Sequence, residues 1–302
     1  MFVSVFQTLF LHSLITVWGS EMMTGENAFK GENIIITGGS SGIGKAAAQA
    51  FIMMGAHVTI AARHEYALQQ SVEEIQSNVV TQNPQIDYAV LDVGNDEKVS
   101  ELADKYNANH GSPYIIINSA GTADAEYFEE MSKEVFDKVI TVNLHGTINM
   151  CRSFIPLMKH SGGHIVNISS MAGLIGIFGY SAYSTTKFAL IGFSQSLRCE
   201  MKRYNINVSV LCPPSVDTPM MAMLEKAPKE TQAIETSGGL ILPAEVVKAM
   251  INGIRKKRFL IIPGTTAKFL YMLTRFTPWL TEWYIDGIVK KNQWNERRVV
   301  GG

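Results

Sequence analysis

A tyrosine and a lysine four residues apart, Tyr183 and Lys187, form the pair with the most evident chemistry in this sequence. Side chains at this spacing lie on one face of a helix, about one turn apart. A nearby ammonium stabilises a phenolate, so Lys187 should lower the pKa of Tyr183 toward neutral pH. On its own, such a pair is common on helix surfaces. Ser170, thirteen residues before Tyr183, adds a hydroxyl donor, and the three together indicate proton transfer to a substrate oxygen.

A glycine-rich loop, Thr37 to Gly44, precedes this group in the chain. It follows a short β-branched segment and leads into an alanine-rich one, so it should join a strand to a helix. In that position, glycines let the backbone approach a pyrophosphate, and the helix N-terminus supplies N–H groups and a positive dipole end. The residues of the loop that we expect to contact a dinucleotide are Gly38, Ser40, Ser41, Gly42, Ile43 and Gly44.

Further cofactor contacts are expected where later strands end. Arg63 follows the second predicted strand, at a place where a carboxylate would bind the ribose hydroxyl of NAD. An arginine suits the 2′-phosphate of NADP instead, so the sequence favours NADPH; solvation of a loop is the alternative role for Arg63. At the ends of the third and fourth predicted strands, the residues expected to contact the cofactor are Asp92, Val93, Asn118, Ala120 and Gly121.

Strand and helix patterns alternate along most of the chain. Predicted strands cover 33–37, 58–62, 89–93, 114–118, 164–169, 207–211 and 259–262, and predicted helices cover 45–54, 66–78, 96–107, 133–159 (interrupted near Pro156), 180–204 and 245–257. The alternation predicts an α/β fold, a single doubly wound parallel-sheet domain of the Rossmann type, over residues 30–264. An apolar N-terminal segment, 1–29, and an amphipathic helical tail, 265–302, fall outside this domain.

Composition narrows the classes of function. The 302 residues are 46% hydrophobic, which supports a substantial core, and the net charge of -1 gives no reason to expect a nucleic-acid partner. The charge is uneven, because residues 251–302 carry ten Lys/Arg against three Asp/Glu. Cys151, Cys199 and Cys212 lack metal-ligand spacing, so we predict no metal site and interpret all three as buried free thiols.

Together these residues resemble the classical short-chain dehydrogenase/reductase family. The matching features are Thr37-Gly38-x-x-x-Gly42-x-Gly44, Asn118-Ser119-Ala120-Gly121, Asn143, Ser170 and Tyr183-x-x-x-Lys187, and they cover roughly residues 30–262. One departure is Ser119, where many members have a second asparagine. The resemblance implies reversible hydride transfer between a nicotinamide and a carbonyl or alcohol carbon, and a homo-oligomer, either a dimer or a tetramer.

The resemblance also implies a role for each site residue. Tyr183 would be the general acid that protonates the developing alkoxide. Lys187 would lower the pKa of this tyrosine and hold the ribose hydroxyls of the nicotinamide. Ser170 would donate a hydrogen bond to the substrate oxygen, and Asn143 would orient a water in a proton relay to Lys187. A buried asparagine needs hydrogen-bond partners in any case, so structural service is the alternative role for Asn143.

Three further segments resemble the 3-ketodihydrosphingosine reductase branch of this family. They are Pro213-Pro214-x-x-Asp217-Thr218-Pro219, the run from Leu174 to Tyr183, and the run from Arg258 to Gly264. That branch reduces the 3-keto group of a long-chain sphingoid base with NADPH at a membrane surface. Pro213, Val216 and Thr218 would flank the nicotinamide.

The segment that follows, Met220 to Leu242, begins with several methionines. Methionines make an adaptable apolar surface that suits an alkyl chain, although a mobile lid would serve almost any substrate. The sequence therefore favours a lipid-like ketone. A reductase acting on steroid, retinoid or fatty-acyl carbonyls is one alternative, and a catalytically idle NADPH-binding or interaction protein is another.

The sequences at both ends of the chain suggest contact with a membrane. Residues 1–20 carry no charged side chain, and they are interpreted either as an anchor or as an extension upstream of a start at Met22 or Met23. The tail mixes aromatic and basic residues, which is typical of a segment lying on a bilayer interface; packing on the domain or on a dimer partner is the alternative. We expect a cytoplasmic protein, peripheral to or anchored in a membrane that faces the cytosol.

Overall fold

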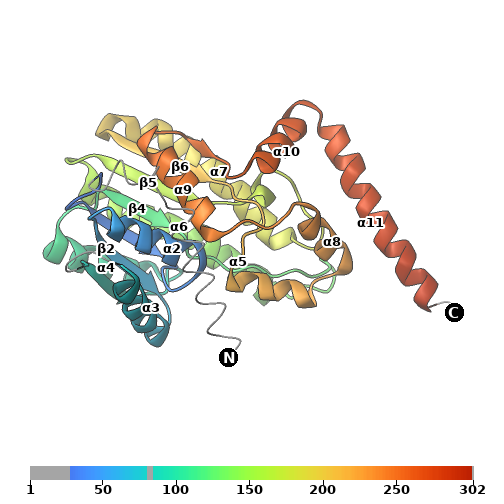
Figure 1. Ribbon diagram of the computed structural model, residues 1–302, viewed down its shortest axis with the longest axis horizontal. Helices are drawn as coiled ribbons and strands as arrows, with labels where there is room; N and C mark the ends of the chain where they lie inside the picture. Colours follow the sequence, from blue (N-terminus) through green and yellow to red (C-terminus); the bar gives the residue numbers. More distant parts are fainter. Residues whose placement is uncertain (1–27, 80–83, 301–302) are drawn as a thin grey trace.

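The computed structural model describes residues 28–79 and 84–300, with the side chains of the last helix described as far as Asn292. The interpretation of residues 1–20 as an anchor or an extension therefore lies outside the described residues. The rest forms an α/β body with a helical tail (Figure 1).

A parallel sheet of seven strands forms the centre of the described chain (Figure 1). Its strands are β1 (Asn33–Thr37), β2 (His57–Ala62), β3 (Ile86–Val90), β4 (Ile115–Asn118), β5 (Gly163–Ile168), β6 (Ile206–Leu211) and β7 (Leu260–Ile261). Their order is β3-β2-β1-β4-β5-β6-β7, with every neighbouring pair parallel. The order reverses direction between β1 and β4, which is where doubly wound sheets bind ligands. The predicted fold class is confirmed.

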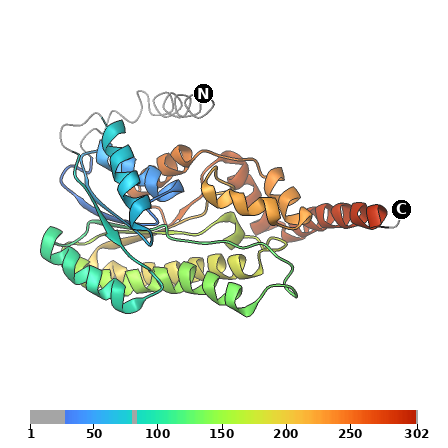
Figure 2. The same ribbon diagram turned by 90° about the horizontal axis from the view of Figure 1, so that it is seen from below.

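Helices cover both faces of this sheet (Figure 2). One layer contains α2 (Gly42–Met53), α3 (Glu65–Asn78) and α9 (Pro243–Arg255), and the other contains α4 (Asp96–His110), α6 (Gly146–Met158) and α7 (Ser181–Met201). The strands are buried from both sides because their apolar residues alternate between the layers. In β1, Ile34 and Ile36 pack in the core beneath α2 and α9, and Ile35 packs in the core beneath α6. A strand that helices cover on both faces needs apolar side chains at successive positions, which explains the continuous apolar run in β1.

Two predicted boundaries were wrong. The third strand is Ile86–Val90 rather than 89–93, because it pairs with Val58 to Ala62 and then ends. It is the edge strand and half exposed, so its sequence lacks the apolar run that marks the inner strands. The long helix over 133–159 is not interrupted at Pro156, which lies inside α6. The prediction that all three cysteines are buried is also wrong, since Cys199 is exposed on α7 while Cys151 and Cys212 are buried free thiols.

The interruption in the long helix lies earlier, at a π-helical turn. This turn, η2 (Thr141–His145), joins α5 (Lys133–Ile140) to α6 and contains the buried Asn143. Single π-turns inside helices often occur at functional sites because the extra residue re-aims one side chain. Here the re-aimed side chain belongs to a residue that the sequence marked for catalysis.

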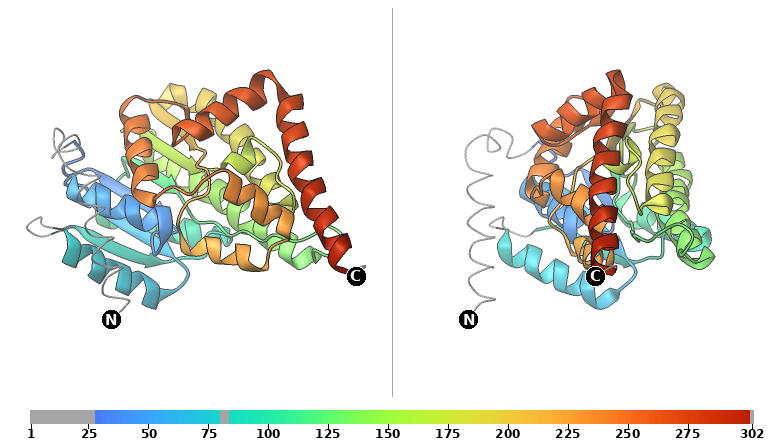
Figure 3. Two further views of the ribbon diagram at one scale, coloured as in Figure 1. Left: turned by 45° about the vertical axis from the view of Figure 1, so that its right-hand side comes forward. Right: turned by 90° about the vertical axis from the view of Figure 1, so that its right-hand side faces the viewer.

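Two short helical turns flank α7: η3 (Met171–Gly173) follows β5, and η4 (Lys202–Tyr204) directly precedes β6. The segment after β6 forms η5 (Pro219–Lys226) and α8 (Lys229–Ser237), which we call the lid. The tail forms α10 (Thr265–Phe276) and α11 (Pro278–Val300), and α11 runs beside α8 of the lid (Figure 3). The lid and the tail lie at the end of the sheet where the strands terminate. In the part of the chain that the structure describes, no helix combines the length and the apolar character that a membrane span requires.

Candidate active site

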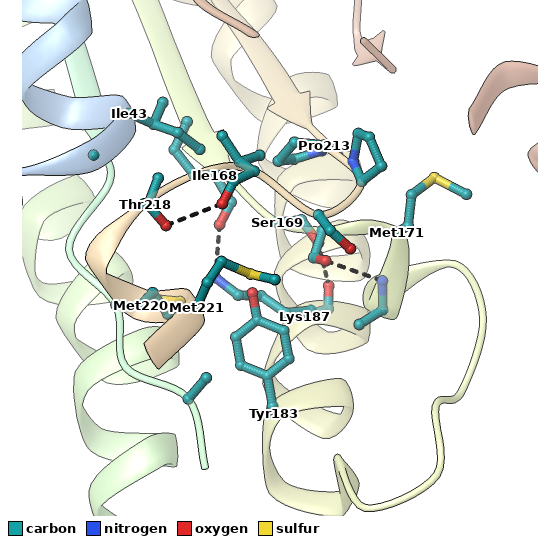
Figure 4. A pocket seen from close by; sticks show the side chains of 18 of the residues that line it. Ile43, Ile168, Ser169, Met171, Tyr183, Lys187, Pro213, Thr218, Met220 and Met221 are labelled. Carbon is teal, nitrogen blue, oxygen red and sulfur yellow. Dashed lines mark hydrogen bonds between the residues drawn. The ribbon is translucent and has the colours of Figure 1, made fainter. Parts of the chain in front are cut away.

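A cavity of about 460 Å³ runs along the carboxyl ends of the central strands (Figure 4). The glycine loop lines one part, the catalytic candidates Ser170, Tyr183 and Lys187 line the middle, and the lid and tail close the far part. This is the place where parallel α/β sheets bind ligands, because the loops at this edge are free to vary. The arrangement brings the glycine loop and the tyrosine–lysine pair into one site.

The glycine loop is held close to the end of β4. Thr37 Oγ1 accepts hydrogen bonds from the backbone N–H groups of Ser119 and Ala120, both at 3.1 Å. Gly38 has φ of +67°, and a Cβ placed there would lie 2.8 Å from the backbone nitrogen of Ala120. Side chains at this position are therefore excluded both by conformation and by space.

The N-terminus of α2 opens toward the cavity from this loop. Its first residue is Gly42, and the side chain of the preceding Ser41 makes no capping hydrogen bond. The first N–H groups of a helix have no intrahelical partner, and together with the helix dipole they favour an anion. The loop therefore fits the pyrophosphate of a dinucleotide, both in its free donors and in its close backbone approach.

Most of the predicted cofactor residues line the cavity. Those that do are Gly38, Ser40, Ser41, Gly42, Ile43, Arg63, Asp92, Val93, Ala120, Gly121, Tyr183, Lys187, Pro213, Val216 and Thr218. Gly44 and Asn118 do not. A Cβ on Gly44 would lie 2.3 Å from the carbonyl oxygen of Gly38, so this glycine packs the helix against the loop. Asn118 is buried, and its amide donates to Asn167 Oδ1 at 2.8 Å, which ties β4 to β5.

Tyr183 and Lys187 lie together on α7, as their spacing predicts. The Lys187 ammonium lies 5.3 Å from the centre of the Tyr183 ring and donates to the backbone carbonyl of Ile168 at 2.9 Å. Figure 4 shows the tyrosine hydroxyl directed into the pocket, with Met220 and Met221 of the lid nearby.

Burial dominates the electrostatics of this pair. It raises the pKa of Tyr183 to about 12, although a hydrogen bond with Ser170 acts in the opposite direction. Burial likewise lowers the pKa of Lys187 to about 8. The expectation that the lysine brings the tyrosine pKa toward neutrality is therefore not met, because desolvation of the tyrosine outweighs the effect of the lysine. Tyr183 is protonated at neutral pH, which is the form that a general acid needs.

The two neighbouring serines at the end of β5 point to different partners. Ser169 is buried and donates to the backbone carbonyl of Lys187 at 2.8 Å, so it holds α7 against the sheet. Ser170 lines the cavity, accepts from the N–H of Ala172 at 3.1 Å, and lies in hydrogen-bond reach of Tyr183. Both serines line the cavity, but the Ser169 hydroxyl is engaged by the backbone of α7, whereas the Ser170 hydroxyl lies beside Tyr183.

Asn143 connects three segments behind the catalytic pair. Its Oδ1 accepts from the N–H of Thr122 at 2.8 Å, and its Nδ2 donates to the carbonyl of Thr122 at 2.9 Å and to Thr186 Oγ1 at 3.1 Å. It therefore pins the segment after β4 to α7, one residue before Lys187. Asn143 does not line the cavity and makes no direct hydrogen bond to Lys187 among the described residues. These contacts give Asn143 a structural role, and its part in a water relay to Lys187 stays a prediction.

The sequence interpretation missed several residues that line the far part of the cavity. They come from the lid and the tail: Leu224, Ile234, Glu235, Thr266, Leu270, Thr281, Tyr284 and Ile285. Packing of the tail on the domain was the alternative interpretation of this segment, but no pattern indicated that the tail covers the site itself. Glu235 belongs to no motif, so only the fold places it here.

Comparisons with known proteins agree with one another on the family and on the fold of this chain. The short chain dehydrogenase family matches residues 32–229. A 3-dehydrosphinganine reductase of Danio rerio is 36% identical over 81% of this chain and 74% of its own length. A 3-ketodihydrosphingosine reductase of Dictyostelium discoideum is 35% identical over 85% of this chain and 81% of its own length. Among solved structures, a short chain dehydrogenase/reductase from Burkholderia phymatum in complex with NAD has a TM-score of 0.74 at 24% identity, covering 84% of this chain and 96% of that one.

Proposed function

We propose that this chain, which belongs to the short-chain dehydrogenase family, reduces 3-ketodihydrosphingosine to dihydrosphingosine with NADPH. As a member of that family it is an oxidoreductase with a nicotinamide cofactor. Two findings together support this substrate: relatives of this chain are named as 3-dehydrosphinganine or 3-ketodihydrosphingosine reductases, and the far part of the cavity is apolar. Consumption of NADPH with this ketone, compared with other ketones, tests it.

The proposed chemistry needs two transfers to one carbonyl group. The reduced nicotinamide supplies a hydride to the carbonyl carbon when it is bound. Tyr183 gives its hydroxyl proton to the carbonyl oxygen, and Ser170 donates a hydrogen bond to the same oxygen as negative charge develops there. The tyrosinate left behind lies 5.3 Å, measured to its ring centre, from the Lys187 ammonium, which stabilises it. Lys187 would also hold the ribose of the cofactor, and Asn143 would keep α7 and the segment after β4 in register for both roles.

The preference for NADPH is proposed from Arg63. This side chain is exposed, follows β2 and lines the cavity at the end that the glycine loop forms. A guanidinium at this position can bind a 2′-phosphate with two parallel hydrogen bonds, whereas NAD offers only a hydroxyl there. Asp92, the carboxylate on the same side, is engaged by the N–H of Gly94 at 2.9 Å.

A long alkyl chain fits the far part of the cavity. Apolar side chains line it from four elements: Ile175 and Ile177 after η3, Met220, Met221, Met223 and Leu224 of η5, Leu270 of α10, and Ile285 of α11. Each methylene that leaves water for such a surface contributes about 0.8 kcal/mol. Methionine side chains adapt their shape to the occupant, so this surface can bind a flexible chain better than a rigid ring system. This favours a long-chain ketone such as the sphingoid ketone over the steroid and retinoid alternatives.

The presence of the complete proton-donor set argues against an idle NADPH-binding protein. Such a protein would need the glycine loop but not a serine and a tyrosine aimed at one point above a buried lysine. From family membership we also propose a homo-oligomer, either a dimer or a tetramer.

We also propose that the tail contacts a lipid bilayer. Five aromatic side chains are exposed on α10 and α11: Phe269, Phe276, Trp279, Trp283 and Tyr284. Exposed basic residues of the same two helices, Lys268, Arg275 and Lys290, add positive charge. Exposed aromatic and basic side chains of this kind match the interface of an anionic bilayer. Leu270 and Ile285 of these helices also line the cavity, so the surface adjoins the place where a lipid-like substrate would bind.

Replacing Phe269, Trp279 and Trp283 by serine should weaken binding to vesicles of phosphatidylcholine and phosphatidylserine by more than about tenfold. The reason is that burying each aromatic side chain contributes roughly 1.5–3 kcal/mol. Sedimentation with the vesicles measures it. The matched control replaces Tyr66 and Phe128, which are similarly exposed on the body, and should bind as the unmodified chain does. Each protein is measured with and without residues 1–22. Equal binding of the tail variant and the parent when 1–22 are absent would refute the role of the tail.

A further inference from the structure

One acidic side chain stands out in the far, apolar part of the cavity. Only two carboxylates, Asp92 and Glu235, line the cavity within the described residues. Asp92 lies with Val93 just after β3, on the cofactor side. Glu235 comes from α8 of the lid, among the methionines and isoleucines that would surround the substrate. Glu235 is half-buried there, in a position where its carboxylate is available to a ligand in the cavity.

Glu235 is joined to the catalytic tyrosine through one intervening ring. Its Oε2 accepts a hydrogen bond from Ser215 Oγ, and its carboxylate also hydrogen-bonds Tyr180. The Tyr180 ring packs edge-on against the Tyr183 ring, with centres 5.4 Å apart. The negative charge of Glu235 is one of the causes that raise the pKa of both tyrosines. The carboxylate therefore lies near the reacting hydroxyl, with the Tyr180 ring between them.

The carboxylate is not neutralised by a cation of the protein. Among the described residues, Glu235 takes part in no ion pair. The cationic side chains that line the cavity are Arg63, on the cofactor side, and Lys187, which donates to the carbonyl of Ile168. Ser215 and Tyr180 are neutral donors, so they orient the carboxylate without removing its charge. A cationic group of the substrate would complete the site.

We propose that Glu235 binds the ammonium group of a 2-amino-3-ketone and so selects an amine at the carbon next to the reacting carbonyl. The inference rests on the proposed function, because 3-ketodihydrosphingosine carries its amino group on that carbon. Glu235 lines the same cavity as Tyr183 and Ser170 and is separated from Tyr183 by one aromatic ring, so it is the carboxylate of the lid that is available to such a group. A charge-assisted hydrogen bond between ammonium and carboxylate is stronger than a neutral one. Glu235 would thus determine specificity for an amino ketone over a plain long-chain ketone.

The test compares two substrates and two enzymes. The substrates are 3-ketodihydrosphingosine and the same long-chain hydroxy ketone without the amino group. The enzymes are the full chain and Glu235→Gln, which keeps the size and the acceptor oxygen but removes the charge. We expect the variant to lose on the order of 10–100-fold in kcat/KM for the amino ketone, mostly through KM, and less than about twofold for the amine-free ketone. The control Glu225→Gln, on the exposed face of η5 and outside the cavity, should change neither.

The outcomes separate this inference from the proposed function. Equal losses for both ketones, or no loss for either, would overturn the role of Glu235 while the proposed function stands. No turnover of 3-ketodihydrosphingosine by the unmodified chain would overturn the proposed function and the inference with it. NADPH affinity, measured by fluorescence titration, should be the same in Glu235→Gln and the parent. A variant that binds NADPH normally and yet loses the preference for the amine supports the assignment.

Discussion

Replacing Tyr183 by phenylalanine should lower kcat by about a thousandfold, because a positioned general acid contributes roughly 10²–10⁴-fold. The substitution removes one oxygen and keeps the ring, so the packing against Tyr180 and the position of α7 should persist. NADPH binding should change less than about threefold, since the glycine loop supplies most of the expected contacts. Steady-state rates and a fluorescence titration of NADPH measure the two effects.

Tyr204→Phe serves as the matched control. Tyr204 follows the same helix, in η4, and does not line the cavity, so its hydroxyl should have no effect on turnover. If Tyr183→Phe retained the activity of the parent, the proton would have to come from elsewhere. If Tyr183→Phe also lost NADPH binding, the main role of Tyr183 would be to bind the cofactor.

Replacing Lys187 by methionine should lower kcat/KM by on the order of 10²–10³-fold, because the buried ammonium stabilises negative charge on the tyrosine oxygen. The length and apolar stem of the side chain are kept, and the charge is lost. Lys202→Met, at an exposed lysine directly after α7, is the control and should retain full activity.

The pH dependence of the unmodified chain gives a second readout of the same group. Burial lowers the pKa of Lys187 to about 8, so the ammonium is present below that pH and is lost above it. Tyr183, with its pKa raised to about 12, stays protonated throughout this range. We therefore expect kcat/KM for ketone reduction to fall as the pH rises through about 8 in the parent. Lys187→Met should lack this descending limb, and an unchanged profile in the variant would contradict the role of the lysine.

The sheet and the central site could be predicted from the sequence because their signals are local. Buried strands such as Ile34 to Ile36 are continuous apolar runs, and a glycine loop between a strand and a helix has few other uses. Ser170, Tyr183 and Lys187 were predicted to lie together, and they do. The edge strand Ile86–Val90 was misplaced because half of it faces solvent and the apolar pattern fades.

What the sequence could not supply depends on contacts between distant segments. The π-turn at Asn143 follows from its hydrogen bonds to Thr122 and Thr186, and no local pattern marks it. The packing of α11 beside the lid brings Ile285 into the cavity, far along the chain from the catalytic residues. The pKa of Tyr183 was misjudged for a related reason, since burial depends on the whole fold whereas the spacing to Lys187 is local.

The most direct test of the account is a panel of ketones with NADPH as the reductant. The panel contains 3-ketodihydrosphingosine, a steroid ketone, a retinoid carbonyl, a fatty-acyl ketone and a short ketone, each repeated with NADH. We predict the highest kcat/KM for 3-ketodihydrosphingosine, at least about 100-fold above the short ketone, since even a few buried methylenes at about 0.8 kcal/mol each account for that ratio. We also predict a clear preference for NADPH over NADH. A higher value for any other ketone, or no turnover of 3-ketodihydrosphingosine, would contradict the proposed function, and equal use of NADH would contradict the role of Arg63.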